Sequence, residues 1–172
     1  HTSQQFGFDD WDKNEILKNS RTMMAHFSAN GYHTLGTGKV MHNRDRQEWD
    51  EYGHPSDYGP FLFDGKDKIP HLGVPSPFRD DFGIIDGTYG PLEKVSHKTS
   101  PDTGKPYSWM TGGWKKQREL KYESDSDRDP TGDELNAQWA VKRLRELAAE
   151  PKGKPFFMGV GFVRPHTPLI VP

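Results

Sequence analysis

The amino-acid sequence predicts an α/β fold with a mostly parallel central sheet flanked by helices. Two segments, about 16–42 and 131–172, each combine a helical apolar pattern with a following β-prone run. Successive helix–strand units build parallel sheets, because the chain must cross back over the sheet before each new strand. The segment between them, about 43–130, has a different character and is expected to be a long irregular insertion.

The first unit begins with a helix and continues into a strand. Ser20 is suited to cap the helix, and Gly31 is suited to end it. The β-prone run 32–39 then predicts a strand, although its two glycines weaken it. The apolar residues at helical spacing in this unit are Ile16, Leu17, Met23, Met24 and Phe27.

The second unit repeats this order. Thr131 and Glu134 have the spacing of a capping box, which predicts a helix start. The uncharged run 155–163 then predicts a strand that is buried on both faces, as in a parallel sheet. The helix between them is expected to bury the apolar residues that lie at helical spacing: Ala137, Ala140, Val141, Leu144 and Ala148.

The segment 43–130 is rich in turn signals. Only 61–63 and 83–85 look like short strands. Because a structureless loop of this length is improbable in a compact domain, it is expected to pack against the core or to line a pocket.

Two tryptophans and a lysine in this segment are candidates for substrate binding. Trp109 and Trp114 lie near Lys115, and aromatic rings beside a cation can stack on a sugar ring and hold an acidic substituent. The alternative interpretation is that these aromatic side chains pin the loop to the surface.

Basic residues follow both predicted strands. Lys39 and His42 follow the first strand, and Arg164 and His166 follow the second. Open α/β sheets bind ligands at the carboxyl ends of their strands. If the chain turns helically after the strand, Lys39 and His42, three positions apart, would converge on one small anion. The alternative is a chance pair on the surface, with His166 a simple turn residue.

Composition excludes several classes of protein. The 172 residues carry a formal net charge of -2, which argues against binding to nucleic acid or to an anionic membrane. No apolar run is long enough to cross a bilayer. Cysteine is absent, which excludes disulfides and Cys-ligated zinc without identifying a compartment. The chain starts without methionine and is 31% hydrophobic, so we expect it to be part of a longer polypeptide.

Two stretches resemble the sulfatase family. The run from Phe27 to His42 resembles the sulfatase segment in which a helix leads through Asn-Gly-Tyr into a strand ending Gly-Lys-x-x-His. The run from Lys154 to Pro168 is similar to the later sulfatase strand ending in Lys/Arg-Pro-His-x-Pro, most like the iduronate-2-sulfatase branch. The resemblance covers about 20–43 and 130–172.

This resemblance implies a fold and an activity. It implies an incomplete alkaline phosphatase-like α/β fold, part of a single sulfatase catalytic domain that comprises 1–172. The activity would be hydrolysis of sulfate esters with a calcium ion and a formylglycine nucleophile. Lys39 would contact the sulfate and the formylglycine hydrate, and His42 would orient or deprotonate that hydrate. His166 would bind the sulfate and protonate the leaving alcohol, which is chemistry suited to imidazole.

The resemblance also implies partners and a compartment. The substrate would be a sulfated small molecule or glycan bound by Arg164 and the aromatic segment, in a periplasmic, secreted or lysosomal protein. Related families leave two alternatives, a phosphodiesterase or phosphonate hydrolase and a non-catalytic relative that binds sulfated glycans.

Parts of the family pattern are missing from the chain. The run 75–79 imitates the nucleophile motif Cys/Ser-x-Pro/Ala-x-Arg, but Pro75 stands at the nucleophile's position. The acidic metal-binding motifs of the family have no match either, so no metal ligand is assigned to this chain. We therefore expect the calcium ligands and the formylglycine to come from the rest of the parent polypeptide. The isolated chain is expected to bind sulfate weakly and to hydrolyse nothing.

Overall fold

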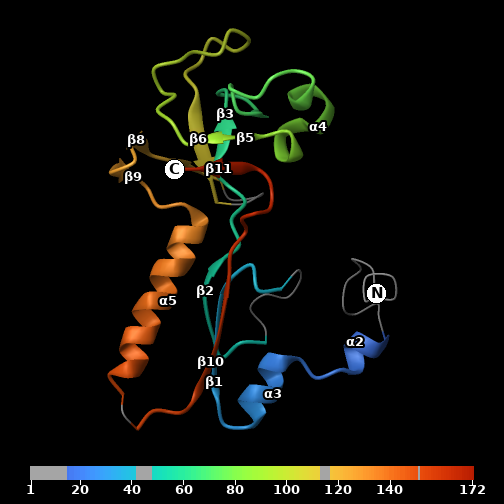
Figure 1. Cartoon of the computed structure of the whole chain (residues 1–172), viewed down its shortest axis with the longest axis vertical. Helices are drawn as coiled ribbons and strands as arrows, with labels where there is room; N and C mark the ends of the chain where they lie inside the picture. Colours follow the sequence, from blue (N-terminus) through green and yellow to red (C-terminus); the bar gives the residue numbers. More distant parts are fainter. Residues whose placement is uncertain (1–14, 42–47, 113–116, 151) are drawn as a thin grey trace.

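The computed structural model describes residues 15–41, 48–112, 117–150 and 152–172. Its lower half in Figure 1 is a three-stranded parallel sheet with the order β10-β1-β2. The strands are β1 (His33–Gly38), β2 (Glu51–Pro55) and β10 (Phe156–Gly161). Helices α3 (Met23–Ala29) and α5 (Gly132–Ala148) lie on opposite sides of this sheet (Figure 1). The α/β fold class and the parallel pairing of the two predicted units are therefore confirmed.

A second sheet forms the upper part of the molecule (Figure 1). It is antiparallel with the order β4-β3-β6-β7. The strands are β3 (Phe61–Phe63), β4 (Lys68–Ile69), β6 (Ser108–Thr111) and β7 (Arg118–Leu120). The main apolar core lies against it and consists of Leu62, Leu92, Val95, Tyr107, Trp109, Leu120 and Ile170.

Shorter elements complete the described chain. Helix α2 (Glu15–Asn19) precedes α3, and helix α4 (Phe78–Asp86) precedes β5 (Tyr89–Pro91). Strands β8 (Tyr122–Ser124) and β9 (Asp127–Arg128) form a hairpin. The last strand, β11 (Leu169–Val171), pairs in parallel with β5 in a separate two-stranded sheet, so the segment after β10 runs from the three-stranded sheet into the upper part of the molecule (Figure 1). Within these ranges, no helix is both long and apolar enough to cross a membrane.

Glycine lets an aromatic side chain lie flat on the parallel sheet. Gly36 of β1 and Gly159 of β10 are paired in register, and a Cβ atom on either would lie within 2.7 Å of the Trp49 ring. On the same face, the Phe157 ring stacks between those of Phe27 and Trp49, at centroid distances of 4.4 and 5.9 Å. Of the two glycines that weaken the predicted strand 32–39, Gly36 is therefore explained by the close approach of the Trp49 ring.

Helix α5 begins with the predicted capping box, in which the Thr131 and Glu134 side chains each bind the other's backbone N–H. The predicted apolar face is wrong in part, because Val141 and Leu144 are 46% and 43% exposed. The helix instead buries Gly132, Asn136 and Ala140. Hydrogen bonds of Asn136 accompany the burial of this face. Its side chain accepts a hydrogen bond from Thr37 Oγ of β1 and donates one to the Gly132 carbonyl.

Strand β10 is not buried on both faces, which corrects a second prediction. It lies at the edge of the three-stranded sheet, and Phe156 and Val160 on one face are 41% and 39% exposed. An uncharged run predicts a doubly covered strand only where further strands and helices cover it.

Three local predictions also differ from the structure. Thr22 caps α3 by accepting from Ala25 N–H, whereas Ser20 donates to the Ile16 carbonyl at the end of α2. The predicted strand at 83–85 lies inside α4. The segment 43–130 also contains more regular structure than predicted, including β2 of the parallel sheet.

Candidate anion-binding site at the strand ends

The carboxyl ends of β1 and β10 lie side by side and bring two predicted site residues into one region. Gly38 pairs with Gly161 at the end of the ladder, and the backbone N–H of Lys39 donates to the Gly161 carbonyl at 3.0 Å. The chain after β10 then forms the turn that carries His166. Lys39 and His166 both contact the same side chain, Tyr58.

The contact between Lys39 and Tyr58 is a hydrogen bond. Lys39 Nζ donates to Tyr58 Oη at 2.6 Å and lies 5.1 Å from the ring centroid. With these two distances the nitrogen must lie beyond the hydroxyl rather than above the ring face, so a cation–π contribution is small. Within the described ranges Lys39 forms no ion pair with a carboxylate. An ammonium that is held by a hydroxyl group rather than by a carboxylate keeps its charge available for an anion.

His166 meets Tyr58 through the ring. The two ring centroids are 5.0 Å apart with an interplanar angle of 87°, an edge-to-face arrangement. His166 Nδ1 lies 2.7 Å from the Thr167 carbonyl oxygen, which can only accept. Nδ1 therefore carries the hydrogen, and Nε2 of the neutral ring is the atom that can take up a proton. The exposed side chain of His166 leaves the ring accessible to a ligand.

The turn that carries His166 is held by helix α5. The Asp133 carboxylate in the first turn of α5 accepts from Val163 N–H at 2.8 Å and from Arg164 N–H at 3.1 Å. The backbone N–H of His166 donates to the Val163 carbonyl at 2.8 Å. The Thr167 hydroxyl donates to Asp86 at the end of α4. These four bonds fix the backbone on both sides of the imidazole.

The segment that carries Tyr58 is held by the second sheet. The buried Asp57 carboxylate accepts from Thr111 Oγ at 2.6 Å and from Gly112 N–H at 2.7 Å. It also accepts from Gly59 N–H at 2.9 Å. The antiparallel sheet thereby fixes the backbone beside Tyr58, whose side chain contacts Lys39 and His166.

Arg164 links the two segments. Its guanidinium donates to the Gly59 carbonyl at 2.8 Å and to the Ile170 carbonyl at 3.4 Å. Burial lowers the pKa of Arg164, and the charges of Asp133 and Asp57 oppose this shift. Because these bonds use one guanidinium nitrogen on backbone carbonyls, they favour a structural role for Arg164 over the predicted contact with substrate.

The other predicted site residues lie elsewhere. His42, Trp114 and Lys115 fall outside the described residues. Trp109 is 2% exposed, belongs to the apolar core, and donates from its indole nitrogen to the Glu93 carbonyl at 2.7 Å. This placement favours the second interpretation of Trp109, in which the ring pins a loop, because a stacked sugar needs an open ring face.

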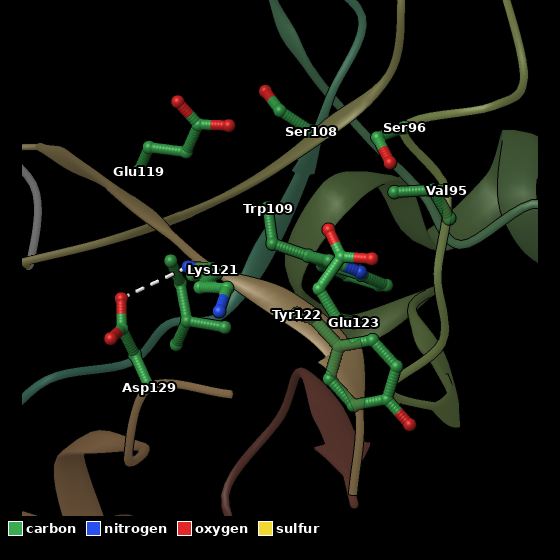
Figure 2. Close-up of a pocket in the computed structure, with 10 residues that line it drawn as sticks. Val95, Ser96, Ser108, Trp109, Glu119, Lys121, Tyr122, Glu123 and Asp129 are labelled. Carbon is green, nitrogen blue, oxygen red and sulfur yellow. Dashed lines mark hydrogen bonds between the residues drawn. The ribbon is translucent and has the colours of Figure 1, made fainter. Parts of the chain in front are cut away.

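A pocket of about 350 Å³ opens beside Trp109 (Figure 2). Its floor is apolar and includes Val95 and Leu120, which are both buried. Its walls carry Lys121 and three carboxylates, and the dashed line in Figure 2 is the bond from Lys121 N–H to Asp129 at 3.0 Å. The surplus of carboxylates makes this pocket unsuited to a sulfate group.

The calcium ion and formylglycine that the resemblance implies do not fit this chain alone. Within the described part of the chain, no group of three His, Asp or Glu side chains is arranged to hold a metal ion. The sequence has no cysteine, and the one run that imitates the nucleophile motif has Pro75 at the nucleophile's position. What this chain offers at the strand ends is an ammonium and an imidazole, which bind anions and transfer protons.

Sequence reasoning missed Tyr58. The residue lies in a turn-rich run, Asp57 to Pro60, which predicts a loop and nothing more. Its role depends on contacts with residues 19 and 108 positions away, which no local pattern reports. The one available signal is that this turn follows a parallel strand, β2, but β2 itself was not predicted.

Comparison with known proteins gives one informative similarity. The chain is 28% identical over 169 residues to a sulfatase of Formosa agariphila, an alignment that covers 94% of this chain and 25% of the relative. The chain thus spans about a quarter of the length of the curated relative it matches. No family model and no solved structure matches the chain. The similarity over nearly the whole chain supports a relation to the sulfatases.

Proposed function

We propose that this chain is part of a sulfatase that hydrolyses sulfate esters, with Lys39 and His166 forming one side of the sulfate pocket. The observation that carries the proposal is their convergence on Tyr58 from the ends of two adjacent parallel strands. The sulfatase relative over 94% of the chain supports the reaction class.

The two side chains suit the two chemical demands of this reaction. A sulfate ester needs cationic donors for the oxygens on which negative charge develops, and the Lys39 ammonium has further N–H groups besides the one given to Tyr58. The leaving alcohol needs a proton as its S–O bond breaks. With Nδ1–H held on the Thr167 carbonyl, His166 can deliver that proton only from Nε2. His42 completes the proposed set, in the orienting or proton-accepting role that the resemblance implies.

The nucleophile and the metal ligands belong to the remainder of the polypeptide in this proposal. Calcium and formylglycine would supply charge stabilisation and the nucleophile there, and no residue of this chain is assigned to hold either of them. The substrate is proposed to be a sulfated carbohydrate, as in the iduronate-2-sulfatase branch.

A hydrolysis assay on the complete polypeptide tests the proposal. The substrates are para-nitrophenyl sulfate and a sulfated monosaccharide, each beside its phosphate analogue. We expect the sulfate esters to be cleaved, and Lys39→Met and His166→Ala to lower kcat/KM by about 100-fold or more. Lys142→Met, on the exposed face of α5, is the matched control and should keep the wild-type rate.

Two results would favour the alternatives instead. Faster cleavage of the phosphate esters would indicate a phosphodiesterase or phosphonate hydrolase. Binding of sulfated glycan without any hydrolysis would indicate a non-catalytic relative.

A further inference from the structure

We infer that Tyr58 is a positioning residue that holds the two functional groups separately, Lys39 through its hydroxyl and His166 through its ring. This inference rests on the proposed function for its catalytic consequence, but its structural content stands on the contacts of Tyr58 alone. The contacts that carry it are a 2.6 Å hydrogen bond to the ammonium and an edge-to-face contact with the imidazole.

The hydroxyl is the part that holds Lys39. A lysine side chain loses about 2 kcal/mol of rotamer entropy when it is fixed in one conformation. In the structure this cost is met on folding, because Nζ is already bound to Tyr58 Oη. An anion then meets an ammonium that is in place, and the binding free energy does not have to include the ordering of the chain.

The ring is the part that holds His166. The imidazole is exposed, so packing on other side chains does little to fix its orientation. Its two described contacts are the Nδ1 bond to the Thr167 carbonyl and the Tyr58 ring at 87°. A single hydrogen bond only partly restricts rotation of the ring about the Cα–Cβ and Cβ–Cγ bonds, and the Tyr58 ring restricts it further.

Tyr58 is rigid enough for this task. The Asp57 carboxylate ties the preceding residue to Thr111 of β6, and the Arg164 guanidinium ties the carbonyl of the following Gly59 to the His166 turn. A Cβ atom on Gly59 would lie 2.8 Å from Thr111 Cα, so the backbone is in close contact with the sheet. The phenol is therefore supported from both sheets, which is what a positioning residue requires.

Two substitutions separate the two contacts. Tyr58→Phe removes the acceptor for Lys39 and keeps the ring against His166, and Tyr58→Leu removes both. Tyr122→Phe is the matched control, because it removes a tyrosine hydroxyl that bonds to Asp125 on the exposed hairpin. Urea unfolding midpoints verify that each variant keeps its fold.

The first measurement is the affinity of the complete polypeptide for inorganic sulfate. We expect Tyr58→Phe to weaken binding about tenfold, because the Lys39 side chain then loses its rotamer entropy when sulfate binds rather than when the protein folds. We expect Tyr58→Leu to weaken it further, and Tyr122→Phe to leave it unchanged. Equal affinity in wild type and both Tyr58 variants would overturn the inference.

The second measurement is the NMR chemical shift of the His166 ring protons. A lower free energy of unfolding does not by itself change this shift in the folded protein. The ring current of residue 58 should shift these protons in wild type and in Tyr58→Phe, and the shift should vanish in Tyr58→Leu. Persistence of the shift in Tyr58→Leu would show that His166 does not lie against residue 58.

The kinetic arm distinguishes failure of this inference from failure of the proposed function. If the complete polypeptide hydrolyses sulfate esters and both Tyr58 variants keep the wild-type kcat/KM, the role of Tyr58 is wrong and the sulfatase proposal stands. If the wild-type polypeptide hydrolyses none, the sulfatase proposal fails, and the sulfate affinities and ring shifts decide the role of Tyr58. We expect a loss of about tenfold in Tyr58→Phe and about 100-fold in Tyr58→Leu.

Discussion

A Cβ atom on Gly38 would lie 1.9 Å from the carbonyl oxygen of Gly161. The two residues end the β1–β10 ladder, and Lys39 donates to that same carbonyl. Gly38 also has a φ of 75°, which L-residues with a side chain rarely adopt. The absence of a side chain at Gly38 is thus a condition for placing Lys39 at the site.

Gly38→Ala should therefore disrupt the site and the fold together. We expect it to lower the free energy of unfolding by about 3 kcal/mol or more, because the new Cβ atom would overlap the Gly161 carbonyl oxygen and neither strand backbone can move away easily. Gly31→Ala is the matched control, since Gly31 has a φ of 85° but open space around its Cβ position, and should cost about 1 kcal/mol. Urea unfolding measures both, and equal losses would contradict the proposed close approach.

The Asp133 carboxylate should support the His166 turn. Asp133→Ala removes the acceptor for Val163 N–H and Arg164 N–H, and bonds to a charged acceptor contribute about 1.5–3 kcal/mol. We expect a loss of stability of this order and weaker sulfate binding, measured by urea unfolding and calorimetry. Asp81→Ala, on the exposed surface of α4, should change neither quantity. Unchanged sulfate affinity in a folded Asp133→Ala variant would show that the turn is held by other contacts.

Thr37 and Asn136 form a buried polar pair between β1 and α5. Thr37→Val leaves the Asn136 carbonyl and the His54 N–H without their hydroxyl partner, at an expected cost of about 1–3 kcal/mol. The double variant with Asn136→Leu should be more stable than the sum of the single losses predicts, by about 1 kcal/mol, because no unpaired group remains between the two side chains. Ser126→Ala, an exposed hydroxyl, serves as control. Strict additivity in the double-mutant cycle would mean that the two side chains do not interact.

Glu134 makes the stability of α5 dependent on pH. Its bidentate bond to Arg128 is the main reason that its pKa is lowered from 4.5 to about 2, with Thr131 contributing and burial opposing. A lowered pKa in the folded state gives stabilisation that is complete above pH 4.5 and is lost as the pH falls towards 2. Because this side chain is 39% exposed, solvent screening reduces the contribution to about 1 kcal/mol.

Glu134→Gln tests this dependence. The difference in unfolding free energy between wild type and the variant should be largest at pH 7 and should shrink between pH 4.5 and pH 2. Glu150→Gln, at an exposed position after α5, should show no such difference. A difference that stays constant from pH 7 to pH 3 would indicate that the ionised carboxylate is not what stabilises the helix start.

The sequence predicts those parts of the molecule in which each residue's role depends on near neighbours. The capping box at Thr131 and the strand predicted at 32–39 carry local patterns, and the structure has the capping box and β1 (His33–Gly38) at these places. β2 has no apolar alternation, so no periodicity in the sequence predicts it. It pairs in parallel with β1, and His54 N–H also donates to the Thr37 side-chain hydroxyl. The exposed face of β10 could not be predicted for a related reason. Whether a strand is covered depends on the segments that pack on it, and its own residues do not report them.

The residues of the candidate site likewise fall into those that local sequence predicts and those that it does not. Lys39 and His166 could be predicted because a basic residue after a buried strand is a local feature with a known place in α/β folds. Tyr58 could not, because its neighbours in sequence indicate only a turn. For Trp109 the sequence left two interpretations open, a binding surface and a ring that pins a loop, and the burial of the ring in the core favours the second.

The most direct test of the central claim is a crystal structure of the complete polypeptide with selenate, a sulfate analogue whose position anomalous scattering identifies. The proposal predicts one selenate with oxygens at hydrogen-bond distance, about 2.7–3.2 Å, from both Lys39 Nζ and His166 Nε2. Selenate bound elsewhere, with neither Lys39 nor His166 in contact with it, would contradict the proposal that these two residues form one side of a sulfate pocket.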